Sequence, residues 1–300
     1  MEVRHLVLLR ELAERGSVHA VAAATHRTPS AVSQQLRTAQ REFGLPLVEP
    51  DGRGLRLTDA GRLLAEGAVD VETAIAQVQA RLDRYRGQPT GQVSVAALAS
   101  AAAFLLPAAF SRLRAEGIAL VCTDVDVAEP DFASFAADYD LVIGHSLTGA
   151  VLAGAEGLVA TVIAREPIDV ALPAGHPLVA KDRLLADDVA AEDWVTVPDG
   201  FPFGEVRRAV ELRTGRTVRR VQQLRDNRLV EAFVAAGLGI GLLPRYTTHP
   251  SPDVVLRPLA DVPATRWIVA LSRPDRARRA VVTRVVDELC AVAPSAPRTD

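Results

Sequence analysis

The sequence predicts an α/β protein that begins with a winged helix-turn-helix and continues through one long helix into a larger α/β domain. Three observations support this prediction: two short helical patterns joined by a tight connection within 17–44, a helical pattern without proline over 58–86, and strands alternating with helices from residue 92 onward. The 300 residues are enough for two or three domains, each with its own hydrophobic core.

The helix-turn-helix is expected between Ser17 and Gly44. An alanine-rich helix comes first, and for the second helix Thr28 is a good N-cap and Pro29 suits the first helical position. Gly44 is a natural end for that helix. One face of the second helix is apolar. The opposite face carries polar residues spaced by four, three and four: Ser30, Gln34, Arg37 and Arg41.

This polar face suits the major groove of DNA. Glutamine can read adenine or contact phosphate, and arginine can read guanine or neutralise phosphate. The same residue types also populate ordinary solvated helix faces, and short helix-turn-helix patterns are common by chance. The face by itself therefore leaves both DNA binding and a solvated helix open.

A two-stranded wing is expected next, with strands at 45–48 and 55–57 and a hairpin tip at 52–54. Residues 1–60 contain eight arginines against seven acidic residues, and the whole chain has a net charge of -3. Positive charge for a polyanion must therefore be concentrated locally. The candidates for that role are Arg37, Arg41, Arg53 and Arg56.

These motifs, taken in order, resemble the N-terminal domain of LysR-type transcriptional regulators. The matching runs are Gly16-Ser17, Ala22-Ala23, Thr28-Pro29-Ser30-Ala31-Val32-Ser33, Gly44-Leu45-Pro46-Leu47 and Leu57-Thr58-Asp59-Ala60-Gly61. The resemblance implies that the second helix reads double-stranded DNA. It adds Thr28, Pro29 and Ser33 to the candidate DNA contacts.

Three positions depart from the family pattern. The family usually has Leu-Glu where this chain has Ala39-Gln40. It usually has Phe, and an arginine two positions later, where this chain has Val48-Glu49-Pro50. An acid and a proline in the wing reduce the positive charge that would face phosphate.

A long helix is expected over 58–86, with Thr58 as its N-cap. Its apolar seam recurs at heptad spacing: Leu64, Ala68, Val71, Ile75, Val78 and Leu82. A helix about 40 Å long cannot bury this seam on the small winged domain alone. A second copy of the helix is the simplest partner, and the resemblance implies dimerisation here through Leu64, Val71, Ile75, Val78 and Leu82. Packing on the C-terminal domain is the alternative.

The rest of the chain alternates strands with helices, which is typical of a parallel α/β sheet. Strands are expected at 93–97, 118–127, 140–144, twice within 158–173, and at 196–197, 218–224, 240–243 and 267–271. Helices are expected from Ser100 to beyond Pro107, and at 132–137, 207–214, 229–236 and 276–292.

This region resembles the family's effector-binding domain, through 104–107, 140–143, 176–178 and 234–244. The resemblance implies a periplasmic-binding-protein-like fold of two lobes around a cleft. The domain limits that follow are 1–57 for the winged helix-turn-helix, 58–86 for the linker and dimerisation helix, 87–91 for a hinge and 92–296 for the effector-binding domain. Lobe one comprises 92–162 and 266–292, and lobe two comprises 163–265.

A ligand cleft is expected at the carboxyl ends of the strands. Ser100 lies between a strand and its helix, so its hydroxyl and the helix N-terminus can receive an anion such as a carboxylate. The resemblance places Ser100 at the ligand-contacting position. Further cleft candidates, for which surface loops are the alternative, are Ala101, Ser146, Phe201, Phe203 and Asn227. Arg225 and Arg228 hint weakly at an acidic effector.

No pattern argues for catalysis, a cofactor or a metal. The glycines of 237–241 follow a helix and precede a strand, the reverse of a dinucleotide-binding fingerprint. Cys122 and Cys290 cannot form a zinc site, so we expect two small buried hydrophobic residues, with redox sensing as the alternative. His145 stands alone, so we expect a solvated or hydrogen-bonded side chain.

The sequence therefore predicts a LysR-type transcriptional regulator, a homodimer or homotetramer that binds DNA and a small-molecule effector. The chain shows no signal-peptide pattern and no apolar run of about 18 residues, so we expect a cytoplasmic protein without a membrane span. The alternative is a small-molecule binding protein or enzyme whose N-terminal helices mediate assembly only.

Overall fold

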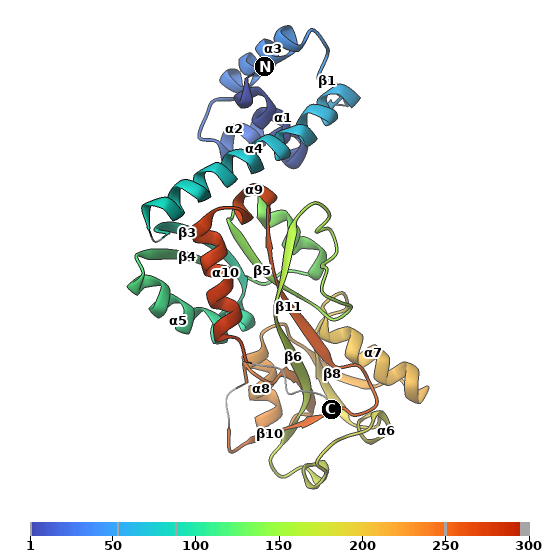
Figure 1. Ribbon diagram of the computed structural model, residues 1–300. Helices are drawn as coiled ribbons and strands as arrows, with labels where there is room; N and C mark the ends of the chain where they lie inside the picture. The colour runs from blue at the N-terminus through green and yellow to red at the C-terminus, as the bar shows by residue number, and fades with distance from the viewer. Residues whose placement is uncertain (1, 53, 88, 249–250, 295–300) are drawn as a thin grey trace. The chain divides into compact units, whose positions relative to one another are not determined.

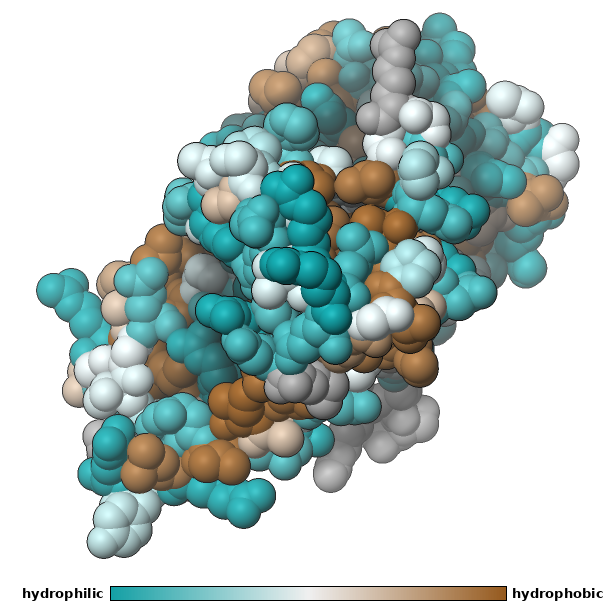
Figure 2. Space-filling model, turned by 90° about the horizontal axis from the view of Figure 1, so that it is seen from above, coloured by the Kyte–Doolittle hydropathy of each residue, from teal (hydrophilic) through white to brown (hydrophobic). Residues whose placement is uncertain are grey.

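A computed structural model describes residues 2–52, 54–87, 89–248 and 251–294 of the chain. The structure divides into two compact units, one formed by 1–89 with 273–283 and the other by 90–272 with 284–300 (Figure 1). In the described part, no helix is long and apolar enough to cross a membrane. Seen from above, the surface intersperses hydrophilic with hydrophobic residues (Figure 2).

The first unit contains the expected helix-turn-helix and wing. Its elements are α1 (Val3–Arg15), α2 (Val18–Ala24), α3 (Pro29–Phe43), β1 (Val48–Asp51), β2 (Gly54–Leu57) and α4 (Asp59–Arg86). The expected N-caps Thr28 and Thr58 are confirmed, since each hydroxyl accepts a backbone N–H three residues later, and Ser17 caps α2 in the same way. The helices enclose a core that includes the fully buried Leu9 and Val32.

The wing begins later than expected. Its first strand is β1 (Val48–Asp51), whereas the sequence pattern suggested 45–48. Leu47 is fully buried in the core below the wing, and its backbone N–H donates to the Gln40 side chain at 2.9 Å, so regular strand pairing begins only after it. Glu49 therefore lies within the wing and stands opposite Arg56 in the antiparallel register.

The second unit is built on a nine-stranded mixed sheet. Across the sheet, the order is β4 (Ile118–Val125), β3 (Gly91–Leu98), β5 (Leu141–Ser146), β11 (Thr265–Ser272), β6 (Val159–Pro173), β9 (Ile240–Pro244), β7 (Asp193–Thr196) and β8 (Arg219–Gln223), and β10 (Val254–Pro258) also pairs with β6. The helical elements in this part of the chain are α5 (Ala99–Ala115), η1 (Glu129–Ala137), η2 (Pro177–Ala180), α6 (Ala186–Val189), α7 (Phe203–Thr214), α8 (Asn227–Ala235), α9 (Pro274–Ala277) and α10 (Ala280–Val292). Figure 1 shows α5 beside β3 and β4, and α8 beside β6 and β10.

Two expected elements differ in this region. The two strands expected within 158–173 are the single strand β6, because its first part pairs with β11 and its last part pairs with both β9 and β10. The single helix expected at 276–292 is two helices, α9 and α10, separated at Arg278-Arg279. Contacts group 273–283 with the first unit, although the sequence analysis included them in lobe one.

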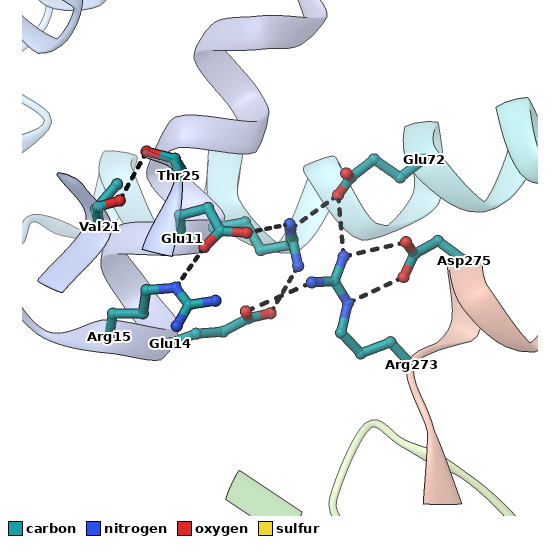
Figure 3. A network of polar contacts seen from close by, with 9 residues as sticks. Glu11, Glu14, Arg15, Val21, Thr25, Glu72, Arg273 and Asp275 are labelled. Carbon is teal, nitrogen blue, oxygen red and sulfur yellow. Dashed lines mark hydrogen bonds and ion pairs between the residues drawn. The ribbon is translucent and has the colours of Figure 1, made fainter. Parts of the chain in front are cut away.

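A network of buried charges joins α1, α4 and α9 within the first unit (Figure 3). Arg10 is only 5% exposed and contacts three carboxylates: Glu11 at 2.7 Å, Glu14 at 2.9 Å and Glu72 at 2.8 Å. The contact from Arg10 Nε to Glu72 is an ion pair without hydrogen-bond alignment. Arg10 is therefore the central cation of this network.

A second cation, Arg273, completes the network. It binds Asp275 through two hydrogen bonds of 3.0 and 3.1 Å, and its guanidinium also lies 3.6 Å from Glu14 and 3.7 Å from Glu72. Burial raises the pKa of both Glu14 and Glu72, and the charge of Arg10 acts in the opposite direction. The arginines thus offset part of the cost of burying the two ionised carboxylates.

We predict that Arg10→Met destabilises the first unit by about 3–5 kcal/mol at neutral pH, because three partly buried carboxylates lose their shared cation. The pKa values of Glu14 and Glu72 should rise further above their unfolded values, so their ionisation opposes folding and the cost disappears as they protonate. Denaturant unfolding should therefore show a smaller deficit at about pH 5 than at about pH 7.

The matched control is Arg62→Met, which removes an exposed ion pair with Asp59 and a hydrogen bond to the Leu57 carbonyl, and which should cost at most about 2 kcal/mol at either pH. An Arg10→Met deficit that is as small as the control, or that does not change with pH, contradicts this account of the network.

Candidate functional site

The polar face of α3 is fully formed on the first unit. Val32, Leu36 and Ala39 are buried on one side of the helix. The opposite side exposes Ser30, Gln34, Arg37 and Arg41. Neighbouring side chains on this side are linked, since Arg37 donates to Gln34 at 2.9 Å and Arg41 donates to Thr38 at 3.2 Å. These bonds hold an amide and two guanidinium groups in an ordered row.

The remaining DNA-binding candidates lie at the start of α3 and in the wing. Thr28 is exposed and caps the helix, its hydroxyl lies 3.0 Å from that of Ser30, and Pro29 is exposed beside it. Ser33 is half-buried. Arg53 lies outside the described residues.

The wing arginine Arg56 is partly neutralised. Its guanidinium lies 2.7 Å from the carboxylate of Glu49 on the neighbouring strand. Both side chains remain largely in solvent, so the pair is weak and can be exchanged for a phosphate contact. The acid that departs from the family pattern therefore acts directly on the wing's positive charge.

The apolar seam of α4 is buried or half-buried in the first half of the helix and exposed in the second half. Ala68 is buried within the unit, whereas Ile75, Val78 and Leu82 are 53%, 62% and 39% exposed. Leu64 and Val71 are half-buried. The second half of the helix thus presents an apolar stripe that the rest of its own unit does not cover.

A cavity of about 470 Å³ opens in the second unit, at the carboxyl ends of β3 and β4. The residues that line it are Leu98, Ala99, Ser100, Ala103, Asp124, Asp126, Val127, His145, Val197, Phe201, Pro202, Phe203, Arg225, Asp226, Asn227, Arg228, Thr247 and Arg266. The N-termini of α5, α7 and α8 all contribute to this lining. Because helix N-termini carry partial positive charge, the cavity favours a negative group on its ligand.

A buried ion pair forms the base of the cavity. Arg266 in β11 and Glu166 in β6 stand opposite each other and are 1% and 0% exposed. Two nitrogens of Arg266 donate to one Glu166 oxygen, at 2.8 and 2.6 Å, and the backbone N–H groups of Tyr246 and Thr247 donate to the other, at 2.6 and 3.2 Å. Both carboxylate oxygens are therefore satisfied within the protein.

The remaining guanidinium nitrogen of Arg266 fixes Ser100. It donates to the Ser100 hydroxyl at 2.8 Å, and the Thr247 hydroxyl donates to the Ser100 carbonyl at 2.8 Å. Because the Ser100 oxygen accepts from Arg266, its own hydrogen is left to donate toward the cavity. The buried pair thus orients Ser100 as a hydrogen-bond donor.

His145 is a neutral component of the same wall. Its pKa lies well below the ordinary value because the ring is buried and, secondly, because Arg266 is positively charged. The 3.5 Å contact between Arg266 Nη1 and His145 Nδ1 requires an accepting Nδ1, which leaves the ring hydrogen on Nε2. Of the two states expected for His145, solvated or hydrogen-bonded, the structure shows the hydrogen-bonded one.

The cleft candidates from the sequence fall into two groups. Ser100, Phe201, Phe203 and Asn227 line the cavity. Ala101 is buried and does not line it, and the Ser146 hydroxyl is occupied by the Thr148 hydroxyl and N–H at 3.0 and 3.1 Å. Whether any of these residues binds an effector stays a prediction.

Sequence reasoning missed Arg266, His145, Asp124, Asp126 and Thr247. For Arg266, the sequence shows a charged residue at the start of an apolar strand, a position where an arginine is commonly solvated. Its partner Glu166 lies 100 residues earlier, so only the fold reveals the pair. Among the described residues, no cluster of histidine, cysteine and acidic side chains is arranged to hold a metal.

The arginines and cysteines also differ from expectation. Arg228 binds the Asp226 carboxylate at 2.8 and 3.2 Å, so Asp226 offsets part of its positive charge, but the pair is exposed and therefore weak. Cys122 and Cys290 are exposed, so the expectation of two buried residues was wrong. Partial desolvation raises the pKa of both thiols, which disfavours the reactive thiolate.

Comparisons with known proteins cover both units. Residues 3–62 match "Bacterial regulatory helix-turn-helix protein, lysR family", and residues 86–293 match "LysR substrate binding domain". The transcriptional dual regulator GltC of Bacillus subtilis is 25% identical over 286 residues, 91% of each protein. The structure of full-length OxyR from Pseudomonas aeruginosa aligns with a TM-score of 0.66 at 20% identity, over 98% of this chain and 96% of that one.

A further solved structure holds DNA. Full-length CbnR in complex with its target DNA aligns with a TM-score of 0.53 at 20% identity, over 96% of this chain and 100% of that one. The fold and the family matches together define a DNA-binding transcriptional regulator with an effector-binding domain. The chain belongs to the LysR family of bacterial regulators.

We predict that Gln34→Ala and Arg37→Ala each cost about 1–3 kcal/mol of specific DNA affinity, because each removes a group suited to a base edge. Fluorescence anisotropy with a duplex from the region upstream of the gene measures the loss. Gln79→Ala and Arg81→Ala remove the same residue types from the exposed surface of α4 and should leave affinity unchanged. Wild-type affinity in both α3 variants would exclude this face as the reading surface.

Proposed function

We propose that the protein acts as a homo-oligomer whose α3 helices read two half-sites of double-stranded DNA, under the control of a small carboxylate-bearing effector in the cavity of the second unit. The observation that carries the proposal is the ordered polar face of α3, within a chain whose family matches span both units. The proposed DNA contacts are Thr28, Pro29, Ser30, Ser33, Gln34, Arg37, Arg41, Arg53 and Arg56.

The proposed dimer forms through α4. The exposed stripe of Ile75, Val78 and Leu82 has the spacing of a coiled-coil seam and needs an apolar partner, which a second copy of the helix supplies. Two copies of α3 joined in this way would meet DNA on the same side, as expected for paired half-sites. Two such dimers would make a tetramer.

The proposed effector carries a carboxylate. Its binding is supported by the Ser100 hydroxyl, by the N-terminus of α5 and by Arg266 behind them. An effector changes DNA binding only to the extent that it binds two arrangements of the protein with different affinity. The coupling is therefore a difference in binding free energy between those arrangements.

We propose regulation rather than catalysis, in the cytoplasm where the DNA lies. The relative GltC, a transcriptional dual regulator that aligns over 91% of this chain, supports this reading. One observation favours a second candidate, a small-molecule binding protein whose first unit only mediates assembly. Glu49 partly neutralises the wing arginine Arg56, which a DNA reader would direct at phosphate.

One experiment separates the two candidates. The purified protein is titrated onto fluorescent duplex from its own upstream region, and onto a scrambled duplex of equal length, across a series of salt concentrations. A regulator gives saturable binding that prefers the upstream duplex, with log K falling linearly against log salt. Equal and weak binding to both duplexes at every salt concentration would favour the assembly reading.

We predict that Ile75→Asp combined with Val78→Asp dissociates the oligomer, because the change places two carboxylates in an apolar seam. Sedimentation velocity should report a monomer where the wild type is a dimer or larger. Gln77→Asp, which adds an acid on the flank of the same helix, should sediment as the wild type does. A double variant that keeps the wild-type mass would refute the α4 interface.

A further inference from the structure

Besides the hydrogen-bond donors at its base, the cavity of the second unit is lined by two carboxylates that have no partner among the described residues. Asp124 and Asp126 both line it from the end of β4. Asp124 is near the end of the strand and Asp126 directly follows β4, and both side chains contribute to the same cavity lining. Within the described part of the chain, neither carboxylate forms an ion pair or a hydrogen bond, and both are exposed.

The acidic wall is next to the donor end of the cavity. In the parallel register, Asp124 stands opposite Ala97 and Val125 opposite Leu98. The chain continues from Leu98 directly into α5, whose second residue is Ser100. Neighbouring strands lie about 4.8 Å apart, so the acidic end of β4 lies beside the start of α5, and both line the same cavity.

The charges around the cavity do not suit a simple anion. The buried Glu166 neutralises Arg266, and the exposed Asp226 offsets part of the charge of Arg228. Arg225, placed 5.7 Å over the ring of Phe201, is then the one lining cation that lacks a carboxylate partner among the described contacts, and it faces two free aspartates. A ligand with only negative charge would bring a further anion close to the unpaired carboxylates of Asp124 and Asp126.

We propose that the cavity binds a free amino acid, with its carboxylate at Ser100 and the α5 N-terminus and its ammonium group between Asp124 and Asp126. This proposal rests on the proposed function, since it names the effector of the same cleft. The side chain of the ligand extends along the apolar part of the lining, which includes Val197, Phe201 and Phe203. The volume of about 470 Å³ holds an amino acid with a large apolar side chain.

The test is calorimetric titration of the full-length wild-type protein with each of the twenty L-amino acids. For every amino acid that binds, the matching acid without the amino group and the matching amine without the carboxylate are titrated too. At least one amino acid should bind saturably. Each truncated analogue should bind about 10- to 100-fold more weakly, because it leaves one charged hydrogen-bonding end unmatched.

The variants assign the two ends of the ligand. Asp124→Asn with Asp126→Asn should weaken the amino acid while leaving the deaminated acid unchanged or tighter, and Ser100→Ala should weaken both. Asp182→Asn removes an exposed carboxylate outside the cavity and should change neither. Far-UV circular dichroism and the melting temperature establish that each variant is folded.

Two results overturn the proposal. Deaminated acids that bind as tightly as the amino acids would show an effector that is only an anion. Absence of binding by all twenty amino acids would exclude this ligand class. In both cases, specific binding of the wild-type protein to upstream DNA decides separately whether the proposed regulatory function stands.

Discussion

The ligand-binding unit depends on one buried ion pair, Arg266 with Glu166. Removing two charges from water costs several kcal/mol for each, and the attraction between them offsets this only where the remaining hydrogen-bonding capacity is also satisfied. Here two backbone N–H groups, from Tyr246 and Thr247, complete the carboxylate, and Ser100 receives the third guanidinium nitrogen. The pair thus connects β6 and β11 with the segment after β9, through Tyr246 and Thr247, and with the start of α5, through Ser100.

That point also determines what the cavity can recognise. Because Glu166 neutralises Arg266, the arginine does not act on a ligand as an open positive charge. It acts through Ser100, whose hydroxyl it turns into a donor, and burial of the neutral His145 keeps a further positive charge out of the site. Selectivity then comes from the charged groups at the rim, where, in the part of the chain that the structure describes, the two unpaired carboxylates of Asp124 and Asp126 outnumber the one unpaired guanidinium, that of Arg225. Anion binding and cation binding are therefore separate features of one cavity.

The first unit uses buried charge in another way. Arg10 and Arg273 share the carboxylates of Glu14 and Glu72, so α1, α4 and the segment after β11 are held together by a network rather than by apolar contact alone. The segment continues directly from the strand that carries Arg266. Strand β11, which carries the cavity residue Arg266, is thus followed directly in the chain by Arg273, which contacts α1 and α4.

The local elements could be predicted from the sequence because their signals are local. Thr28 and Pro29 fix the start of α3, the heptad spacing identifies α4, and Gly44 marks a helix end that the structure confirms. The wing strand shifted because burial of Leu47, a tertiary effect, decides where pairing begins. The prediction of two strands within 158–173 was wrong, because the single strand β6 is held by pairing with three strands that are distant in sequence.

The candidate site was predictable only in part, for the same reason. Ser100 was recognised from a strand-to-helix junction, and the aromatic residues Phe201 and Phe203 from their loop position, although Phe203 begins α7. Arg266 carries no local signal for a role at Ser100, since 166 residues separate them. In the sequence, Asp124 and Asp126 are ordinary acidic residues near a strand end. Only the parallel pairing of β3 with β4 shows that this strand end lies beside the start of α5.

The central claim is that Arg266 and Glu166 act as a single unit, and a double-mutant cycle on unfolding free energy measures this directly. Glu166→Gln and Arg266→Met should each cost about 3–5 kcal/mol, because each leaves a buried group without its partner. The double variant should cost at least about 1.5 kcal/mol less than the sum of the two. Single costs that add within about 0.5 kcal/mol would contradict the claim, because independent residues add in that way.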